Sequence, residues 1–590
     1  MSIGGLGTTA TADDAEKLRA APNAERDLHR LFKKHGLSLP IKIRKITHTS
    51  EDEEAIEFEH VDPSDWLSFL IRRYPFVLAG GDKPKREQLL GFWEIYRLHH
   101  PSHEVFLYHN DHLDRVWPLR FFGDEGRGPR RSTYMEGTIE TPLGISENPQ
   151  PCNCCHILRE MPTHWLPDMP QVESTPNMSA VQHVCSNYKG RSFLKRYLCF
   201  SLPGYVYDTR AEIVTNHLDE IASNLATLFT NGVSVDGVTH YGALIGSKGD
   251  LKFQKEIANL TRSYAHMGRH QSLHMCSLCH AGEDRYPMED CQLEPEWRHS
   301  LFLDRPWSVT PGFSRVNFDP TCPEYLYKLD FFHIFKCGLG RDICGSTLLW
   351  LTSLGAYDYE GSTRNLPDRL TRCHSHFKLW ATTNSHHPAL RKFTKLFLNI
   401  KSSRSSPWTN SKGSDTMLIL KYLRFFLGLL LTDPQENFAG NRLMLELCLK
   451  LVQNCLDMAD LIYSHKMFLP RNCAAKLYLH IKIVLRAYKH LAKFFLDQKR
   501  SGFRLKPKFH ALDHLAYELR VSLKSTAPLI ISPILWSCEP NEDHVGRISK
   551  MSRQLATKTL TLRLTERYFL KSRALFRRNE LSRKKRKVNG

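Results

Sequence analysis

Three acidic positions of the chain each follow an apolar stretch that has the pattern of a β-strand. They are Asp124 after residues 116–122, Asp250 after residues 241–245, and Glu542 with Asp543 after residues 529–536. A carboxylate at the end of a strand in an α/β sheet points into the crevice where such sheets bind ligands. Each position also has a structural interpretation, because acids are common in glycine-rich turns and at helix N-termini.

Taken together, these acids have the composition of a two-metal site. Carboxylates can hold two divalent cations, one of which activates a nucleophile while the other stabilises a leaving oxygen. Mg²⁺ keeps part of its water shell, so two or three carboxylates and the substrate phosphates are sufficient. We therefore predict Mg²⁺ at Asp124, Asp250 and Glu542, with Asp543 and then Asp330 as alternatives for the third acid.

A pair of cysteines, Cys276 and Cys279, has the two-residue spacing of thiolates that bind one tetrahedral zinc ion. We predict a small zinc-stabilised loop, with His274 and Cys291 as the first choices to complete the ligand set. His270 and His299 remain open as alternatives. A second group, Cys152, Cys154, Cys155 and His156, is packed too tightly to match a common zinc site.

Asp330 and His333 lie three residues apart and share a helical face just before Gly338. Such a pair can bind metal, but it can equally cap and support a helix junction. We favour the structural role.

The net positive charge of the chain favours a polyanionic partner. The 590 residues include 81 Lys and Arg against 62 Asp and Glu, a formal net charge of +19. This balance suits nucleic acid or an acidic membrane surface. The N-terminal residues lack the charged and apolar regions of a signal peptide, and the most apolar stretch, 417–431, is too short to span a bilayer. We expect an intracellular protein with reduced thiols and no membrane partner.

Basic residues near the predicted acids are candidates for contacts with DNA phosphates: Arg127, Arg130, Arg131, Lys248, Lys252, Arg547, Lys550 and Arg553. The chain closes with a cluster of the kind that serves as a nuclear localisation signal: Arg583, Lys584, Lys585, Arg586 and Lys587. We therefore expect a nuclear protein whose partners are DNA, further copies of the chain on DNA, and a nuclear import receptor.

The pattern predicts an α/β fold, with a ribonuclease-H-like mixed-sheet core, a large all-α insertion and a helical N-terminal region. The predicted parts are a disordered lead-in (1–40), the helical N-terminal region (41–115), the first part of the core with the zinc loop (116–290), its continuation with Asp330 and His333 (291–401), a Ser-rich linker (402–413), the helical insertion (414–528), the last strand and acidic helix of the core (529–578), and the basic tail (579–590).

Short motifs also resemble known transposases. The KGDLK segment followed by Cys276-x-x-Cys279, and the later Asp330-x-x-His333, resemble blocks of CACTA-type DDE transposases. The series GDEGRG, KGDLK, CSLC, GLGRD, KPKFH and NEDHVGRISK is similar to transposase-like open reading frames abundant in dinoflagellate genomes. The resemblance implies Mg²⁺-dependent cleavage and transfer of DNA strands, with Asp124 and Asp250 as the first two catalytic acids.

Two other functions stay open at this point. A non-catalytic, zinc-containing nuclear DNA-binding protein derived from a transposable element would bind DNA without cutting it. A helical scaffold with a basic tail used only for transport would show no affinity for DNA. The spatial arrangement of the carboxylates distinguishes the enzyme from both.

Overall fold

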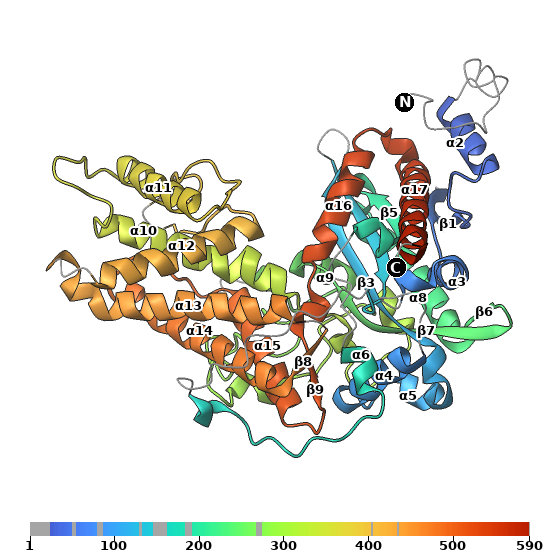
Figure 1. Cartoon of the computed structure of the whole chain (residues 1–590), viewed down its shortest axis with the longest axis horizontal. Coiled ribbons are helices and arrows are strands. Elements are labelled where there is room, and N and C mark those ends of the chain that lie inside the picture. Colours follow the sequence, from blue (N-terminus) through green and yellow to red (C-terminus); the bar gives the residue numbers. More distant parts are fainter. Residues whose placement is uncertain are drawn as a thin grey trace.

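A computed structural model describes residues 24–49, 55–78, 86–128, 132–144, 162–182, 191–266, 274–402, 405–432, 436–465 and 467–588. Figure 1 shows two lobes, one built around a β-sheet and the other almost entirely of helices. Each lobe has its own large cluster of buried apolar side chains.

A seven-stranded mixed sheet forms the first lobe, in the order β1-β2-β5-β4-β3-β7-β6. The strands are β1 (Arg44–Thr49), β2 (Ala55–His60), β3 (Val116–Arg127), β4 (Thr133–Glu140), β5 (Tyr197–Pro203), β6 (Val233–Val235) and β7 (Val238–Lys248). Strands β3, β4 and β5 are antiparallel neighbours, whereas β7 runs parallel to β3. The centre of the sheet is covered on both faces, since most residues of β3, β4 and β5 are buried.

Helices cover this sheet: α8 packs on β7, α16 on β3 and α17 on β5. The helices of the lobe are α2 (Ala24–Lys34), α3 (Pro63–Arg73), α4 (Arg86–His99), α5 (Val105–Tyr108), α6 (Met178–Gln182), α7 (Gly204–Tyr207), α8 (Ala211–Thr230), α9 (Leu251–Ile257), α16 (Glu539–Ser552) and α17 (Leu560–Val588). Three fully buried tryptophans, Trp66, Trp93 and Trp117, anchor the core between helices and sheet.

The second lobe contains α10 (Gly340–Ser353), α11 (Leu366–Thr383), α12 (Gly413–Thr432), α13 (Arg442–Ser464), α14 (Arg471–Asp497) and α15 (Pro507–Leu523). Helices α12 to α15 pack in sequence against one another. The apolar stretch 417–431 lies in α12, with one side in the core, as predicted. Among the described residues, no helix has the length and apolar character needed to cross a membrane.

Three boundaries differ from the sequence predictions. Helix α2 lies inside the segment predicted to be disordered, and strands β1 and β2 lie inside the segment predicted to be helical. In these strands buried Ile46 and His48, and buried Phe58 and His60, alternate with more exposed residues, the period of a strand rather than a helix. Strand β9 (Leu529–Ile531), predicted to complete the core, pairs instead with β8 (Phe468–Pro470) in a separate small sheet.

Candidate active site and metal centre

The register of two parallel strands brings Asp124 and Asp250 together. Phe122 of β3 pairs with Lys248 of β7, and each acid comes two residues after its paired residue. Neighbouring strands lie roughly 4.8 Å apart. The two acids therefore lie side by side: Asp124 within β3, where it pairs with Glu136 of β4, and Asp250 just beyond the end of β7.

Both acids follow a glycine because one aromatic ring packs against both positions. A Cβ added at Gly123 would approach Phe253 to 2.0 Å, and one added at Gly249 would approach the same ring to 2.3 Å. Asp250 also caps α9, since its Oδ1 accepts a hydrogen bond from the Phe253 backbone N–H at 2.7 Å. The capping interpretation of Asp250 is thus correct, and it fixes the carboxylate at the strand end.

Helix α16 brings Glu542 to the same place. Its first turn is tied to the sheet by Lys248, whose Nζ donates to Asn541 Oδ1 at 2.9 Å. One turn later His544 contacts Glu136 of β4, with 2.9 Å between Nδ1 and Oε1. These contacts hold the N-terminal turn of α16 over the strand ends.

The pKa values show that the three acids share one electrostatic environment. Burial raises the pKa of Asp124 well above its usual value, and the negative charges of Glu542 and Asp250 raise it further. Burial also raises the pKa of Glu542, and Asp330 and Asp250 add to this effect. Within the described part of the chain, no Lys or Arg forms an ion pair with Asp124 or Asp250. Clustered carboxylates that no Lys or Arg neutralises are suited to a divalent metal.

Asp330 is not a member of the acid cluster; it holds residues next to the cluster in place. Its Oδ1 accepts hydrogen bonds from the backbone N–H groups of Phe332 and Cys538, at 2.9 and 3.0 Å. Its Oδ2 lies 2.6 Å from His333 Nδ1. With both oxygens engaged, Asp330 orients the histidine and fixes the start of α16, which is the structural role predicted for it.

His333 is the cation nearest to Glu542 among the described residues, with 3.4 Å between its Nε2 and Glu542 Oε1. Although burial opposes the charged form, the hydrogen bond to Asp330 and the surrounding carboxylates raise the pKa of His333 to about 9. His333 lies in a π-helical segment, Phe332–Leu339. Such segments are rare and often occur at functional sites.

Asp543 lies outside the cluster. Its Oδ2 accepts hydrogen bonds from Ser192 Oγ and from Arg547 Nε, each at 2.7 Å, and half of its side chain is exposed. These contacts hold Asp543 away from the cluster formed by Asp124, Asp250 and Glu542.

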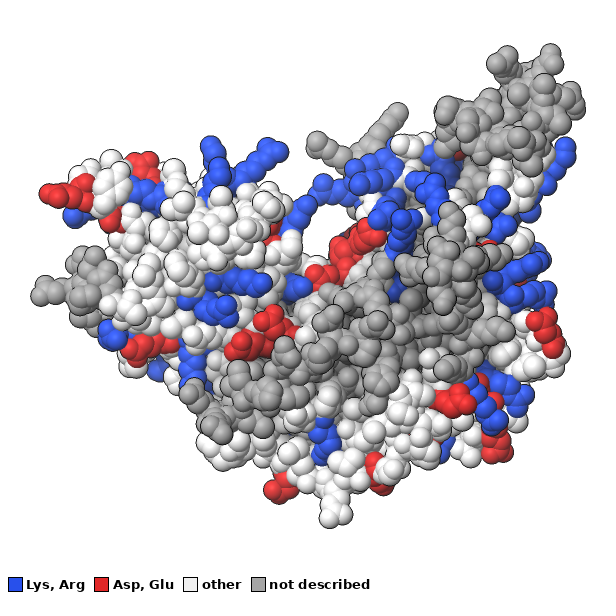
Figure 2. All heavy atoms as spheres, in the orientation of Figure 1, with Lys and Arg blue, Asp and Glu red and all other residues white. Residues whose placement is uncertain are grey.

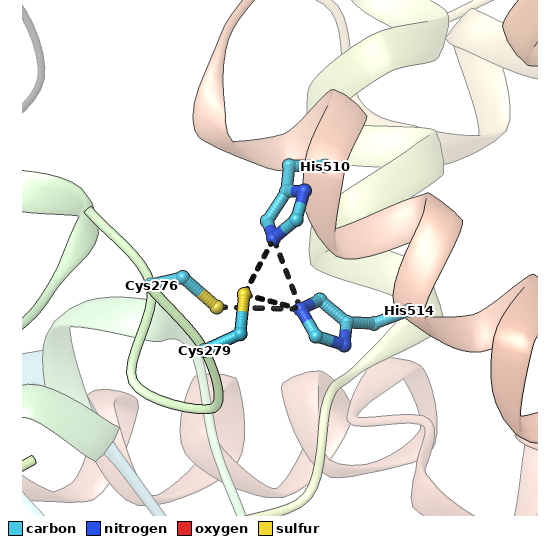
Figure 3. A group of neighbouring side chains, drawn as sticks. All are labelled: Cys276, Cys279, His510 and His514. Carbon is cyan, nitrogen blue, oxygen red and sulfur yellow. Dashed lines mark hydrogen bonds between the residues drawn. The ribbon is translucent and has the colours of Figure 1, made fainter. Parts of the chain in front are cut away.

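A second site consists of Cys276, Cys279, His510 and His514, whose ligand atoms all lie within 4.8 Å of one another (Figure 3). Cys279 Sγ lies 3.2 Å from His510 Nε2 and 3.4 Å from His514 Nε2, and Cys276 Sγ is also 3.4 Å from His514 Nε2. The two histidines are four residues apart on one face of α15, and Trp297 packs against both. Two thiols and two imidazoles grouped this closely could hold one metal ion, and two Cys with two His is a donor set common in zinc sites.

The ligand partners chosen from the sequence are wrong. His274 is about half exposed and faces Glu283, with 3.5 Å between Nδ1 and Oε1. Cys291 is buried in the apolar cluster of the helical lobe. The signal that sequence reasoning missed is the His-x-x-x-His spacing at 510 and 514, which lies more than 200 residues from the cysteines. His270 and the group from Cys152 to His156 lie outside the described residues.

The predicted phosphate-binding residues that the structure describes comprise one buried lysine and several exposed basic residues. Lys248 is only 1% exposed and pairs with Glu140 at 2.6 Å, so its assignment to DNA binding is wrong. Lys252 is exposed but pairs with Glu125 at 2.5 Å. Exposed positions also include Arg127, Arg547, Lys550 and Arg553.

The remaining basic candidates are described in part or not at all. Arg130 and Arg131 lie outside the described residues. The backbone of Arg583 to Lys587 continues α17, but the positions of those side chains are not described.

Figure 2 shows a hollow between the two lobes, with Asp and Glu side chains on its wall and Lys and Arg side chains along its rim. A groove with an acidic wall and a basic rim can bind a phosphodiester through bridging metal ions while the rim neutralises neighbouring phosphates.

Comparison with known proteins gives no assignment: no protein-family model matches the chain, and no curated protein matches it. The function must therefore be argued from the geometry of the site.

Proposed function

We propose that the chain is a transposase-like nuclear protein that cleaves and transfers DNA strands with Mg²⁺ held by Asp124, Asp250 and Glu542. One observation carries this proposal. Three carboxylates from positions separated by up to 418 residues share one electrostatic environment where the parallel pairing of β3 and β7 ends, and no Lys or Arg among the described residues pairs with the two aspartates.

The order of the strands supports a ribonuclease-H-like core. The chain forms the antiparallel series β3-β4-β5, passes through α8, and returns as β7 parallel to β3. The helical lobe is inserted between β7 and α16, so that the third acid follows the insertion. This is the layout in which a strand, a second strand and a helix each contribute one acid.

When bound, Mg²⁺ would supply activation of the attacking oxygen and stabilisation of the leaving oxygen. The protein's own groups prepare the site for it. Asp250 is fixed by its cap on α9, and Glu542 is fixed by the anchored first turn of α16. His333, kept protonated by Asp330, places a positive charge beside Glu542 where a phosphate would bind. Exposed Arg547, Lys550 and Arg553 on α16 would neutralise phosphates on either side of the cut.

The proposal also assigns a zinc ion to Cys276, Cys279, His510 and His514. Zinc there would join the loop that follows the first half of the core to α15 of the helical lobe. Its role would be structural, because four protein ligands leave no open position.

Strand cleavage tests the acid cluster. On duplex DNA with Mg²⁺, Asp250→Asn and Glu542→Gln should each reduce the cleavage rate by about a thousandfold, since a metal supplies several kcal/mol of transition-state stabilisation. Asp543→Asn is the matched control, because it changes the residue next to Glu542 without touching the cluster, and it should retain activity. Equal cutting by the wild type and Asp250→Asn would reject the assignment.

A wild type that binds DNA in a salt-sensitive way but cuts none under these conditions would favour the non-catalytic DNA-binding protein instead. A protein without affinity for DNA would reject both and leave a helical scaffold.

Metal content tests the second site. The purified wild type should contain about one zinc per chain, and Cys276→Ser should lose it and unfold at a lower temperature, because zinc binding contributes directly to folding. Cys291→Ser is the control: it removes a buried thiol outside the group and should keep the metal. Equal zinc content in both variants would contradict the proposed ligand set.

The basic end of α17, from Arg583 to Lys587, is proposed to bind a nuclear import receptor, and assembly of several chains on DNA is proposed as the active form. A fluorescent fusion lacking residues 583–587 should stay outside the nucleus, and the full chain should enter it.

A further inference from the structure

A pocket with a volume of about 470 Å³ lies in the helical lobe. Pockets for small organic ligands typically have volumes of roughly 300–1,000 Å³. The residues that line it come from the end of α10, the start of α11, the segment between α11 and α12, and the end of α14 with the turn that follows it. Figure 1 shows α11 at the end of the helical lobe away from the sheet. None of the lining residues belongs to the acid cluster or to the Cys/His group, so the pocket is a separate site.

The charged side chains that line the pocket all have the same sign. They are Arg364, Arg369, Lys499 and Arg500, and no Asp or Glu is among the described residues of the lining. Arg369 forms an ion pair with Asp358. The other three cations are exposed, and none of them forms an ion pair with a described residue. The pocket thus carries three positive charges that the described part of the protein does not neutralise, which favours an anionic ligand.

Two acids that lie close to these cations in sequence have other partners. Asp368 Oδ2 accepts hydrogen bonds from Thr363 Oγ1 at 2.5 Å and from Asn365 Nδ2 at 2.8 Å. Asp497 Oδ2 lies 3.6 Å from Lys493 Nζ, on the same helix. Neither acid lines the pocket. The positive charge of the lining is therefore available to a ligand.

The backbone of Lys499 indicates that its side chain has a function. Lys499 directly follows the C-cap residue of α14 and has a φ of 54°, in the left-handed region. Glycine is the usual residue at such a position, because a Cβ is strained there. The turn itself is fixed by backbone hydrogen bonds, from Lys499 N–H to the Leu496 carbonyl and from Arg500 N–H to the Phe495 carbonyl, each at 2.8 Å. A lysine where the backbone favours glycine is consistent with a ligand-binding role for the side chain.

The rest of the lining combines apolar and hydroxyl groups. Leu349, Leu366 and Ile400 line the pocket and are only partly buried, so their side chains can contact a ligand. Ser353 and Ser402 also line it and are exposed. The lining therefore suits a ligand that has an apolar body and hydroxyl groups next to its anionic group.

We propose that this pocket binds a small phosphorylated molecule of the size of a nucleotide. Arg364, Lys499 and Arg500 would hold the phosphate oxygens through charge-assisted hydrogen bonds, and Leu366 and Ile400 would contact the apolar body. Duplex DNA fits less well, because its bases are stacked inside the helix and would leave the apolar lining uncovered. The inference does not rest on the proposed function, since the pocket shares no residue with the acid cluster.

Binding of ATP, used as the probe, tests the inference. Equilibrium dialysis of the full-length protein against labelled ATP is done in Mg²⁺-free buffer, which prevents binding through Mg²⁺ at the acid cluster. We expect saturable binding of one ATP per chain. Arg364→Ala, Lys499→Gly and Arg500→Ala should each weaken binding by about tenfold, since each removes charge-assisted hydrogen bonds to phosphate. Lys450→Ala is the matched control: it removes an exposed lysine of α13 that does not line the pocket, and it should bind ATP as the wild type does.

Lys499→Gly also separates binding from folding. Glycine relieves the left-handed backbone, so this variant should unfold at a slightly higher temperature than the wild type while it binds ATP more weakly. Loss of thermal stability together with loss of binding would assign Lys499 to the fold and count against the inference.

Three results would overturn the inference. The first is a wild type that binds no ATP at millimolar concentration, and the second is ATP binding that all three variants retain. The third is displacement of ATP by a DNA duplex whose own affinity the same variants reduce, which would assign the cations to DNA. Inorganic phosphate that competes as strongly as ATP would show that the apolar lining contributes nothing, and would overturn the nucleotide-sized ligand.

Discussion

Two groups of charged side chains lie on or next to β3 and β7, and they are built in opposite ways. Glu140 at the end of β4 contacts three cations: Lys248 Nζ at 2.6 Å, Arg120 at 3.0 Å and Arg196 at 3.2 Å. Burial alone would raise the pKa of Glu140, but these cations lower it to about 2. Asp124, four residues beyond Arg120 on β3, has no such partner among the residues that the structure describes, and its pKa is raised.

We interpret the difference as that between a structural group of charges and the proposed metal site. Where the protein needs a buried carboxylate for the fold, it surrounds that carboxylate with its own cations. Asp124 and Asp250, in contrast, have no ion pair with a described Lys or Arg, and the only cation of the described residues that contacts the cluster is His333, beside Glu542. Unpaired acids beside fully paired ones on one sheet are therefore a stronger indication of a metal site than acids alone.

The largest effect on stability should come from removing Glu140 and with it the buried ion pairs to its three cations. Glu140→Ala leaves three buried cations without their carboxylate, and we expect a loss of about 3–5 kcal/mol in the free energy of unfolding. Urea denaturation measures it. Glu57→Ala removes an exposed ion pair with Lys45 on β1 and should cost less than about 1 kcal/mol. A similar small loss for both variants would show that the Glu140 group does not stabilise the fold.

The second-largest effect on stability should come from lowering the pH, which removes the stabilisation that the Glu140 ion pairs provide. A pKa lowered in the folded state means that the stabilisation by Glu140 is complete above its ordinary value of 4.5 and is lost as pH falls towards about 2. The change corresponds to roughly 3 kcal/mol. Unfolding measured across this range should show a shallower dependence on pH for Glu140→Gln than for the wild type, and parallel curves would contradict the ion-pair account.

Removing a charge from the acid cluster should increase the stability of the fold, whereas removing Glu140 should decrease it. Because the pKa of Asp124 is raised, its charge opposes folding at neutral pH, so Asp124→Asn should increase stability in metal-free buffer by on the order of 1 kcal/mol. Adding MgCl₂ should stabilise the wild type, since an ion that binds only the folded state shifts the unfolding equilibrium, but it should not stabilise the variant. Thermal unfolding with and without MgCl₂ gives both results. A variant less stable than the wild type in metal-free buffer would place Asp124 among the structural charges.

The smallest expected effect is on DNA binding by the exposed basic residues of α16. Replacing Arg547 or Lys550 with alanine should weaken DNA binding for all sequences and reduce the slope of log affinity against log salt by about 1 for each lost phosphate contact. Lys493→Ala changes an exposed lysine of α14, in the helical lobe, and should leave the slope unchanged. Fluorescence anisotropy over a salt series measures the slopes, and equal slopes for all three proteins would remove α16 from the DNA interface.

Sequence patterns were sufficient for those parts of the site that depend on local structure. Asp250 stands just beyond the end of β7, as predicted, and the helical lobe follows the three- and four-residue spacing of its apolar side chains. The prediction that the strand before Asp124 ends at residue 122 is wrong, because β3 continues to Arg127 and Asp124 pairs with Glu136 of β4. The pair Cys276 and Cys279 was found from its spacing. The predictions failed where the partner is remote: His510 and His514 lie on another lobe, and no local signal connects them to the cysteines.

Lys248 shows most clearly what a sequence cannot determine. A lysine beside a predicted catalytic acid has the pattern of a phosphate ligand, yet its side chain is directed into the sheet, where it contacts Glu140 and Asn541. Glu542 and Asp543 are adjacent in sequence, but only Glu542 belongs to the acid cluster.

The sequence by itself determined where the apolar stretches of β3 and β7 stop and which polar residues follow them, because apolar periodicity and turn residues act over a few positions. Only the tertiary structure decided which of these residues meet. Parallel register sets Asp124 beside Asp250, and the anchoring of α16 selects one of two neighbouring acids. Both depend on contacts between segments more than a hundred residues apart, for which a single sequence carries no record.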